Sequence, residues 1–267
     1  MHGVHIDKPR EECGVFGIYS TDPALQAAHL TYLGLYALQH RGQESCGIAV
    51  SDGERIRLYK GMGLVSEVFG GEQLRDLPGP CAVGHVRYST SAAERMVINA
   101  QPLLVECSYG RLALAHNGAL TNANSLRREL MDQGSAFQTT TDSEVIINLI
   151  ARHGQVPLEE ALKRTYARLR GAFAVVGMTP KGMFGWRDPS GMRPLAMGRL
   201  GSDTYLLASE TCALSNLSAE DIREIRPGEM VIITEDGPRS YQLAEEHTQA
   251  FCVFEYIYFA RPDSTID

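Results

Sequence analysis

Apolar and polar positions along the chain repeat with two different periods. Apolar residues recur at helical spacing between residues 21 and 42, and again at 124–133, 141–150 and 157–170. Short apolar runs bounded by turn residues predict strands at 13–19, 48–50, 56–59, 81–88, 103–106, 112–115, 172–178, 183–187, 204–208, 230–234 and 252–259. These elements lack the regular alternation of strand and helix that a parallel sheet requires. We therefore expect an α+β fold in which helices cover two antiparallel sheets.

Turn and capping residues mark the ends of several of these elements. A capping residue followed by proline at 21–23 predicts a helix start. Asp-Gly pairs at 52–53 and 236–237 predict hairpin turns. Residues 141–144 have the Thr-x-x-Glu form of a capping box. Gly34 lies inside the first expected helix, where glycine costs about 1 kcal/mol relative to alanine, so we expect close packing against a neighbour.

Composition narrows the function classes. The 267 residues are 44% hydrophobic and 21% charged, which is ordinary for a globular protein of one large or two smaller domains. A net charge of −7 argues against nucleic-acid binding. No apolar run approaches the ~20 residues of a membrane span, and residues 1–12 lack the apolar stretch of a secretory signal. Six cysteines without a C-x-x-C pair fit reduced thiols in the cytoplasm.

Short motifs change the interpretation of Cys13. From composition alone, this residue would be interpreted as a buried cysteine in a strand. Residues 84–90 (GHVRYST), 116–118 (HNG) and 141–144 (TDSE), taken with this cysteine, resemble the class II glutamine amidotransferases. Those enzymes are N-terminal-nucleophile hydrolases. The resemblance implies an αββα sandwich, in which two antiparallel sheets lie between helix layers.

A narrower resemblance comes from three further segments. Residues 12–17 (ECGVFG), 38–44 (LQHRGQE) and 255–264 (EYIYFARPDS) resemble the amidophosphoribosyltransferase branch of these enzymes. The resemblance runs from about residue 11 to the end of the chain without large gaps. It implies hydrolysis of glutamine to glutamate, with the ammonia passed to phosphoribosylpyrophosphate. That transfer is the first step of purine synthesis.

The resemblance makes Cys13 the nucleophile that attacks the side-chain amide of glutamine. In this superfamily the nucleophile's own α-amine acts as the base, and its reference pKa of ~7.7–8.0 suits proton transfer near neutral pH. An α-amine exists only on the first residue of a chain. Residues 1–12 are therefore expected to be a propeptide that is removed. His85 and His116 are expected to be structural, since this mechanism leaves no clear role for an imidazole.

Five other residues match family positions. Asn117 and Gly118 are expected to donate hydrogen bonds to the oxyanion, although Asn-Gly is also a common hairpin turn. Arg87 is expected to hold the glutamine α-carboxylate and Asp142 the α-ammonium. Asp142 would also favour the helix N-terminus on which it lies. Arg41 is expected to order the surroundings of the nucleophile, or to be a cation that merely suits a helix C-terminus.

The resemblance also predicts how the chain divides. Residues 1–12 would be the propeptide, 13–248 the glutaminase domain, and 249–267 the start of a truncated phosphoribosyltransferase domain. A strongly apolar strand so close to the last residue indicates a fragment. Adjacent acidic residues followed by a Gly- and Thr-rich phosphate loop do not occur. The chain is therefore expected to hydrolyse glutamine without performing the transfer.

Cofactors and partners follow from the same resemblance. Cys252 matches a ligand position for a [4Fe–4S] cluster in the iron–sulfur branch, although a buried strand cysteine is the alternative. The other three thiolates would lie outside this chain. Mg²⁺ and phosphoribosylpyrophosphate are expected to bind the full-length enzyme, which is expected to be a homo-oligomer. Two alternatives remain: another class II amidotransferase, or an unprocessed, non-catalytic domain kept for assembly or regulation.

Overall fold

Two antiparallel sheets form the centre of the molecule. The computed structural model describes residues 13–88, 96–244, 261 and 263–264. Within these residues a seven-stranded sheet contains, in spatial order, β11 (Glu220–Glu224), β9 (Ala196–Leu200), β10 (Thr204–Ala208), β1 (Gly14–Ser20), β4 (Cys81–Arg87), β2 (Ser45–Ser51) and β3 (Ile56–Met62). A six-stranded sheet contains β13 (Gly237–Gln242), β12 (Glu229–Thr234), β8 (Gly182–Arg187), β7 (Gly171–Thr179), β6 (Gly110–Leu120) and β5 (Leu103–Cys107).

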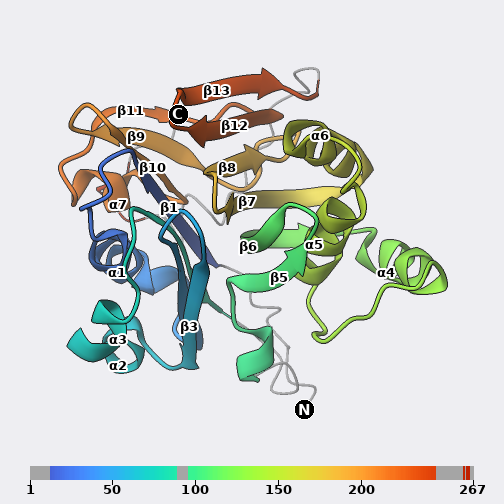
Figure 1. Cartoon of the computed structure of the whole chain (residues 1–267), viewed down its shortest axis with the longest axis horizontal. Helices are drawn as coiled ribbons and strands as arrows, with labels where there is room; N and C mark the ends of the chain where they lie inside the picture. Colours follow the sequence, from blue (N-terminus) through green and yellow to red (C-terminus); the bar gives the residue numbers. More distant parts are fainter. Residues whose placement is uncertain (1–12, 89–95, 245–260, 262, 265–267) are drawn as a thin grey trace, which may run out of the picture.

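Helices cover the outer face of each sheet (Figure 1). The seven-stranded sheet is covered by α1 (Ala27–Ala37), α2 (Val65–Val68), α3 (Gly71–Arg75) and α7 (Thr211–Ser215). The six-stranded sheet is covered by α4 (Ala123–Asp132), α5 (Ser143–Arg152) and α6 (Leu158–Arg168). Short 3₁₀ turns lie at η1 (Gln39–Arg41) and η3 (Val97–Asn99). The predicted αββα sandwich is confirmed.

Three layers of buried side chains hold these four layers of structure together. Alternation along each strand sends successive side chains to opposite faces of its sheet. In β1, Phe16 and Ile18 face α1, whereas Val15 lies in the core between the two sheets. In β6, Leu112 and Leu114 face the helices, whereas Ala113 and Ala115 face the other sheet. Small side chains on the inner faces therefore let the sheets approach closely.

Most of the strands expected from the sequence are present, and both Asp-Gly hairpin turns are confirmed between β2 and β3 and between β12 and β13. The helix expected from residue 21 begins only at Ala27, so that prediction is wrong. Asp22 accepts a hydrogen bond from the backbone N–H of Ala24 at 2.9 Å and closes a turn instead. The strand expected at 252–259 and the tail at 1–12 lie outside the described residues.

The capping box expected at residues 141–144 is not formed. Helix α5 begins with Asp142 at its N-cap and has no side-chain hydrogen bond there. The Glu144 carboxylate accepts hydrogen bonds from the backbone N–H groups of Gln138 and Thr139, both at 2.7 Å. A loop that folds back over the helix start therefore competes successfully for the carboxylate.

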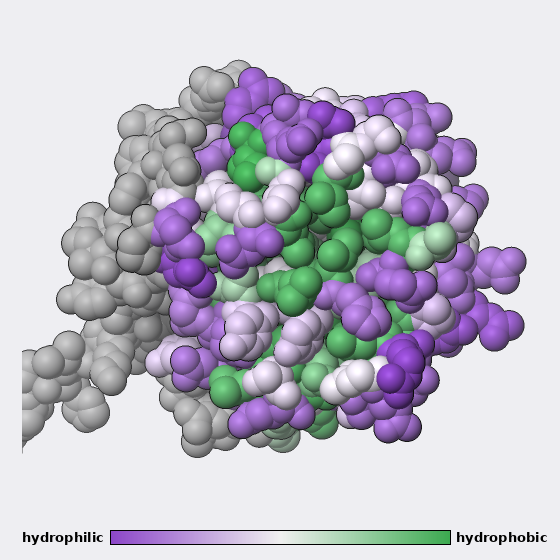
Figure 2. All heavy atoms as spheres, turned by 90° about the vertical axis from the view of Figure 1, so that its left-hand side faces the viewer, coloured by the Kyte–Doolittle hydropathy of each residue, from purple (hydrophilic) through white to green (hydrophobic). Residues whose placement is uncertain are grey.

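An apolar area is exposed on the outer face of the α1 layer, which faces the viewer in Figure 2. On α1, Leu33 and Tyr36 are 49% and 56% exposed. Tyr36 stacks on Tyr32 of the same helix, with ring centroids 6.3 Å apart. Among the described residues, no helix is long and apolar enough to span a membrane.

Gly34 provides a test of the close packing that the sequence predicted. A Cβ atom at this position would lie 2.4 Å from Cε2 of the fully buried Phe16. Gly34→Ala should gain about 1 kcal/mol of helix propensity, but overpacking typically costs about 1–3 kcal/mol. We expect a net loss in the free energy of unfolding, measured by urea denaturation.

Gly71→Ala is the matched control, because Gly71 also lies in a helix and its added Cβ would meet only the flexible end of Arg75. This variant should be neutral or slightly more stable. Equal stability changes in the two variants would contradict the packing argument.

Candidate active site

A cleft of about 250 Å³ lies where β1, β4 and β6 approach the start of α5. Four of the site residues predicted from the sequence line this cleft: Cys13, Arg87, Gly118 and Asp142. They come from parts of the chain up to 129 residues apart (142 − 13). The sandwich therefore brings a thiol, a cation, a strand glycine and a carboxylate to one place, and Asn117–Gly118 does not form the alternative hairpin turn.

The pairing of β1 with β4 sets the position of Cys13. Gly14 pairs with Val86, so Cys13 lies beside Arg87 at the end of the ladder. Val15 faces the space between the sheets, and alternation sends the Cys13 side chain to the same face. Cys13 is 7% exposed. Its thiol therefore lies at the edge of the inter-sheet core, where the cleft opens.

His85 lies two residues before Arg87 and connects the two sheets. Its Nε2 is 3.1 Å from the carbonyl oxygen of His116 on β6. Burial lowers the pKa of His85 to about 3, and the nearby charge of Arg87 adds to this effect. The ring is therefore neutral at physiological pH. That state fits the structural role expected for this residue.

Asn117 and Gly118 occupy the last part of β6. Asn117 is completely buried, and neither polar atom of its amide has a hydrogen-bond partner among the described residues. Leaving a buried polar group unpaired typically costs about 1–3 kcal/mol. Gly118 has φ +129°, and a Cβ there would lie 2.1 Å from the carbonyl oxygen of Ala172, so only glycine fits. An amide that folding leaves unpaired is available to a reacting group.

Arg87 is 6% exposed and pairs with a residue that sequence reasoning did not identify. Its Nη1 lies 3.3 Å from Oε1 of Glu44. The backbone N–H of Glu44 donates to the carbonyl oxygen of Arg87 at 3.0 Å, which fixes the two residues side by side. The guanidinium is thus held at the cleft with one carboxylate already against it.

Asp142 is the N-cap residue of α5 and is held from two directions. Its Oδ2 accepts a hydrogen bond from the backbone N–H of Leu120 at 2.8 Å, and its Oδ1 lies 3.4 Å from Nδ1 of His116. Burial opposes ionisation, but His116 and the backbone N–H groups of Leu120 and Ser143 outweigh it and lower the pKa of Asp142. An ionised carboxylate therefore faces the cleft near neutral pH.

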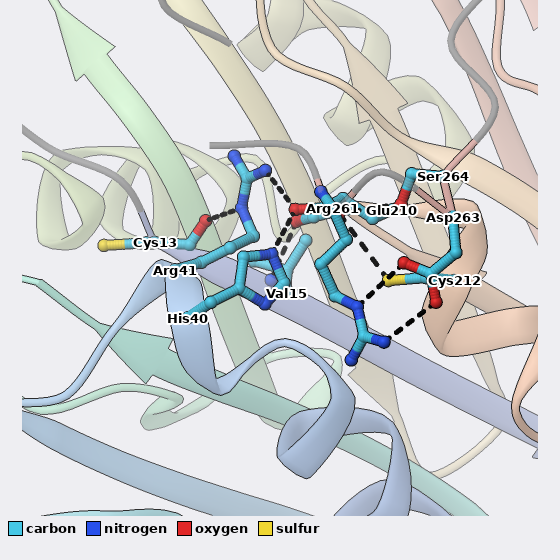
Figure 3. A network of polar contacts seen from close by, with 10 residues as sticks. Cys13, Val15, His40, Arg41, Glu210, Cys212, Arg261, Asp263 and Ser264 are labelled. Atoms are coloured by element: carbon cyan, nitrogen blue, oxygen red, sulfur yellow. Dashed lines mark hydrogen bonds and ion pairs between the residues drawn. The ribbon is translucent and has the colours of Figure 1, made fainter. Parts of the chain in front are cut away.

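Arg41 does not line the cleft but contacts the backbone of Cys13, the residue that the sequence predicts to be the nucleophile. Its side chain is buried, and its Nε donates to the carbonyl oxygen of Cys13 at 3.0 Å. Its Nη1 donates to Oε1 of Glu210 at 2.7 Å (Figure 3). His40 Nε2 lies 2.7 Å from the same oxygen. The arginine thus links the backbone of Cys13 to a buried carboxylate.

Glu210 follows β10 and joins this group to a distant segment. Its Oε2 accepts hydrogen bonds from the backbone N–H of Arg261 at 3.1 Å and from Oγ of Ser264 at 2.8 Å (Figure 3). Burial would raise its pKa, but His40 and Arg41 hold the pKa of this carboxyl far below its ordinary value. Sequence reasoning missed Glu210. One signal in the sequence could have identified it. An acidic residue between an apolar strand and a short apolar helix is expected to be buried, and a buried carboxylate needs a partner.

The described residues do not form a metal site. Nowhere in residues 13–88, 96–244, 261 and 263–264 do three His, Cys, Asp or Glu side chains gather to hold a metal ion. Burial raises the pKa of the Cys46 and Cys81 thiols to about 12, which disfavours the thiolate that a cluster needs. Cys252 lies outside the described residues. These residues do not fit an iron–sulfur cluster, and we derive no step through one.

The comparisons with known proteins agree with this geometry. Residues 85–216 match the family model described as a glutamine amidotransferase domain. The chain is 16% identical to a glutamine aminotransferase class-II domain protein of Silicibacter pomeroyi, with a TM-score of 0.56, a likeness of fold alone. The chain therefore carries a glutamine amidotransferase domain at residues 85–216, within a sandwich of two antiparallel sheets between helix layers.

Within that class the chain is homologous to the amidophosphoribosyltransferases. It is 50% identical over 264 residues to the amidophosphoribosyltransferase of Synechococcus elongatus, covering 97% of this chain and 53% of the relative. The solved glutamine phosphoribosylpyrophosphate amidotransferase of B. subtilis, complexed with ADP and GMP, is 46% identical with a TM-score of 0.89. That match covers 96% of this chain and 54% of that structure. The chain thus spans about half the length of these relatives.

The buried carboxylate of Glu210 predicts a pH-dependent stability. Glu210→Gln removes the charge that pairs with the buried Arg41, which should lower the free energy of unfolding by about 3 kcal/mol at pH 7. The folded-state pKa of Glu210 is lowered, so its contribution is complete above the unfolded value of about 4.3. As pH falls below that value, the contribution is lost, by up to about 1.4 kcal/mol per pH unit.

Urea denaturation of both proteins between pH 7 and pH 3 measures this difference. The gap between the wild type and Glu210→Gln should be constant at higher pH and shrink below about pH 4.3. A gap that stays constant down to pH 3 would show that Glu210 is not an ionised, paired group in the folded protein.

Proposed function

We propose that this chain hydrolyses the side-chain amide of glutamine, with Cys13 as the nucleophile. The observation that carries the proposal is the cleft, where Cys13 lies with the cation of Arg87, the carboxylate of Asp142 and Gly118 of strand β6, the residue that follows the buried Asn117. Free glutamine offers a carboxylate, an ammonium group and one amide. Each of these has a complementary group in or beside the cleft. The match to a glutamine amidotransferase domain supports the same substrate.

The first half of the reaction forms a covalent intermediate. The Cys13 thiol gives its proton to the α-amine, and the thiolate attacks the amide carbon. The Asn117 side-chain amide and the backbone N–H of Gly118 donate hydrogen bonds to the oxyanion that develops. The C–N bond breaks as the α-ammonium returns the proton to the leaving nitrogen. The products of this half are ammonia and a γ-glutamyl thioester on Cys13.

Water completes the reaction. The α-amine takes a proton from the water, which attacks the thioester carbon, and the same two donors hold the second oxyanion. The C–S bond then breaks, glutamate leaves, and the proton returns to the thiolate. The sum is glutamine plus water giving glutamate plus ammonia. An unpaired Asn117 amide suits this sequence, because no existing hydrogen bond must break when the oxyanion forms.

An α-amine on Cys13 requires removal of residues 1–12, and we propose that these residues are a propeptide. A reference pKa of ~7.7–8.0 lets such an amine exchange protons near neutral pH. The lowered pKa of the buried His85 supports this assignment, since a ring that resists protonation is a poor general base for the same task.

The charged ends of glutamine have separate partners in the proposal. The guanidinium of Arg87 holds the α-carboxylate through two parallel hydrogen bonds, for which its planar fork is suited. The lowered pKa of Asp142 keeps a negative charge available for the α-ammonium. Glu44 then fixes the orientation of Arg87 from the side away from the substrate.

We further propose that the chain is the glutaminase part of a longer amidophosphoribosyltransferase. The relatives that bear this name are about twice as long. In that protein, residues 249–267 would begin a phosphoribosyltransferase domain, where ammonia replaces the pyrophosphate of phosphoribosylpyrophosphate to give 5-phosphoribosylamine. Mg²⁺ there, a cluster held by Cys252 and a homo-oligomer remain predictions. Free thiols among the described cysteines support a reducing compartment such as the cytoplasm.

Intact-mass spectrometry tests the nucleophile and the processing together. We expect a mass that lacks residues 1–12, and one added label at Cys13 after treatment with a diazo-ketone analogue of glutamine. Cys13→Ser should take no label. Cys46→Ser is the matched control and should be labelled as the wild type is, because Cys46 is a buried thiol. A full-length mass without label would overturn the proposal and favour a non-catalytic domain.

Asn117→Ala separates catalysis from folding. Loss of one oxyanion donor should lower kcat about 10²–10³-fold. The free energy of unfolding should change by less than about 1 kcal/mol, because the amide has no partner to lose. Ammonia release and urea denaturation measure the two effects.

Asn99→Ala is the control for stability. Asn99 is equally buried, but its side chain exchanges two hydrogen bonds with Thr140, at 3.1 and 3.2 Å. This variant should lose about 1–3 kcal/mol of stability. Asn117→Ala with unchanged kcat would remove Asn117 from the oxyanion site.

A further inference from the structure

Glu210 is a buried carboxylate with both oxygens in use, on two different parts of the chain. Oε1 accepts a hydrogen bond from Nη1 of Arg41 and lies 2.7 Å from Nε2 of His40. Both of these residues lie on the turn that follows α1. Oε2 receives the backbone N–H of Arg261 and the hydroxyl of Ser264, 51 and 54 residues further along the chain. The mechanism proposed above uses neither Glu210 nor residues 261–264.

We propose that Glu210 is a positioning residue, which holds Arg41 against the carbonyl of Cys13 and passes the position of residues 261–264 to the nucleophile. The inference rests on the proposed function of Cys13. Figure 3 shows the arrangement: Arg41 lies between Cys13 and Glu210, and Arg261 and Ser264 lie on the far side of the carboxylate. Glu210 acts through Arg41 and touches no reacting atom.

The contacts make this coupling direct. The Arg41 guanidinium is planar and rigid, so its Nε and Nη1 donors keep a fixed geometry relative to one another. Nε meets the Cys13 carbonyl oxygen at 3.0 Å and Nη1 meets Glu210 at 2.7 Å. A shift of the carboxylate therefore turns the guanidinium and moves its contact with Cys13. The surroundings are dry, since the Arg41 and Glu210 side chains are 0% and 2% exposed.

Neighbouring backbone contacts explain why the movement would reach the nucleophile. The residue before Glu210, Ser209, exchanges two hydrogen bonds with Val15: its Oγ accepts from Val15 N at 2.9 Å, and its N–H donates to Val15 O at 3.0 Å. Residues 209–210 thus hold β1 at two points, at Val15 directly and at Cys13 through Arg41. Cys13 cannot keep its place while that segment moves.

Ser264 connects the segment near the end of the chain to the carboxylate of Glu210. Its hydroxyl and the backbone N–H of Arg261 donate to the same oxygen, and Asp263 pairs with the Arg261 guanidinium at 2.8 Å. A rearrangement of Arg261 and Ser264 removes donors from Oε2. The carboxylate then moves toward its remaining partners, the Cys212 thiol, His40 and Arg41, and the arginine follows.

A carbonyl chemical shift tests the coupling without requiring activity. The chain is labelled with [1-¹³C]cysteine, and the Cys13 signal is assigned with Cys13→Ser. We expect the Cys13 carbonyl shift to change in Glu210→Gln and, by less, in Ser264→Ala. Glu229→Gln is the matched control: Glu229 is a buried carboxylate on β12 that pairs with Arg223 at 2.8 Å and accepts from the backbone N–H of Arg226. It should leave the shift unchanged.

Labelling kinetics with the diazo-ketone analogue give the functional consequence. Glu210→Gln should lower the maximal labelling rate about 10- to 100-fold, the loss expected for a misplaced reacting group. The half-saturating concentration of the analogue should stay the same, because Arg87 and Asp142 are unchanged. In an Arg41→Gln background, Glu210→Gln should cause no further loss, because it acts through that arginine.

The outcomes separate this inference from the proposed function. If the wild type takes no label, the proposed function is wrong. The carbonyl shifts still test whether Glu210 is coupled to Cys13. A Cys13 signal unmoved by Glu210→Gln or by Ser264→Ala overturns the inference. So do labelling losses that multiply in the Arg41→Gln/Glu210→Gln double variant, since Glu210 would then act by another route.

Discussion

The position of β1 in the middle of its sheet is the constraint on which the site depends. It pairs with β4 on one side and β10 on the other, and its side chains pack against α1 and against the second sheet. Cys13 is the residue immediately before this strand. Cys13 therefore adjoins a central strand of the fold, although it lies at a chain position where a mobile terminus would be ordinary. Catalytic groups placed on such elements hold their geometry better than groups on loops.

Several buried polar groups near the end of these strands have atoms that folding leaves unpaired. Asn117 has neither amide atom bonded within the described residues, and the same holds for Nδ1 of His85 and Nε2 of His116. A core optimised for stability would avoid such groups. His116 lines the cleft and Asn117 precedes Gly118, which also lines it, a pattern expected where stability is given up for chemistry. The surrounding apolar layers, with Val15, Ala113 and Ala115 fully buried, supply the stability that this arrangement costs.

The local pattern of apolar residues was sufficient to predict the layers of the fold, but it did not predict the contacts that connect them. Short continuous apolar runs located β1, β4, β6 and β7, because a strand between two packed faces must bury both sets of side chains. It misplaced the start of α1, where an aspartate closed a turn before the helix could begin. Motif resemblance pointed to Cys13 and its neighbours in the cleft. Glu210 and Glu44 escaped, because their roles come from partners 169 and 43 residues away, and no local spacing records such a contact.

The Arg41–Glu210 pair also shows why a buried ion pair should not be explained by stability alone. Removing two charges from water costs several kcal/mol, and apolar residues of similar volume are often as stable. Apolar side chains would pack in the same space, yet they would form no directional hydrogen bonds. A guanidinium fixes a carbonyl oxygen by an N–H bond of defined length and angle, and a carboxylate accepts from four N–H and O–H donors on two segments at once. At the start of β1, these charges therefore fix the position of the backbone rather than add to the stability of the fold.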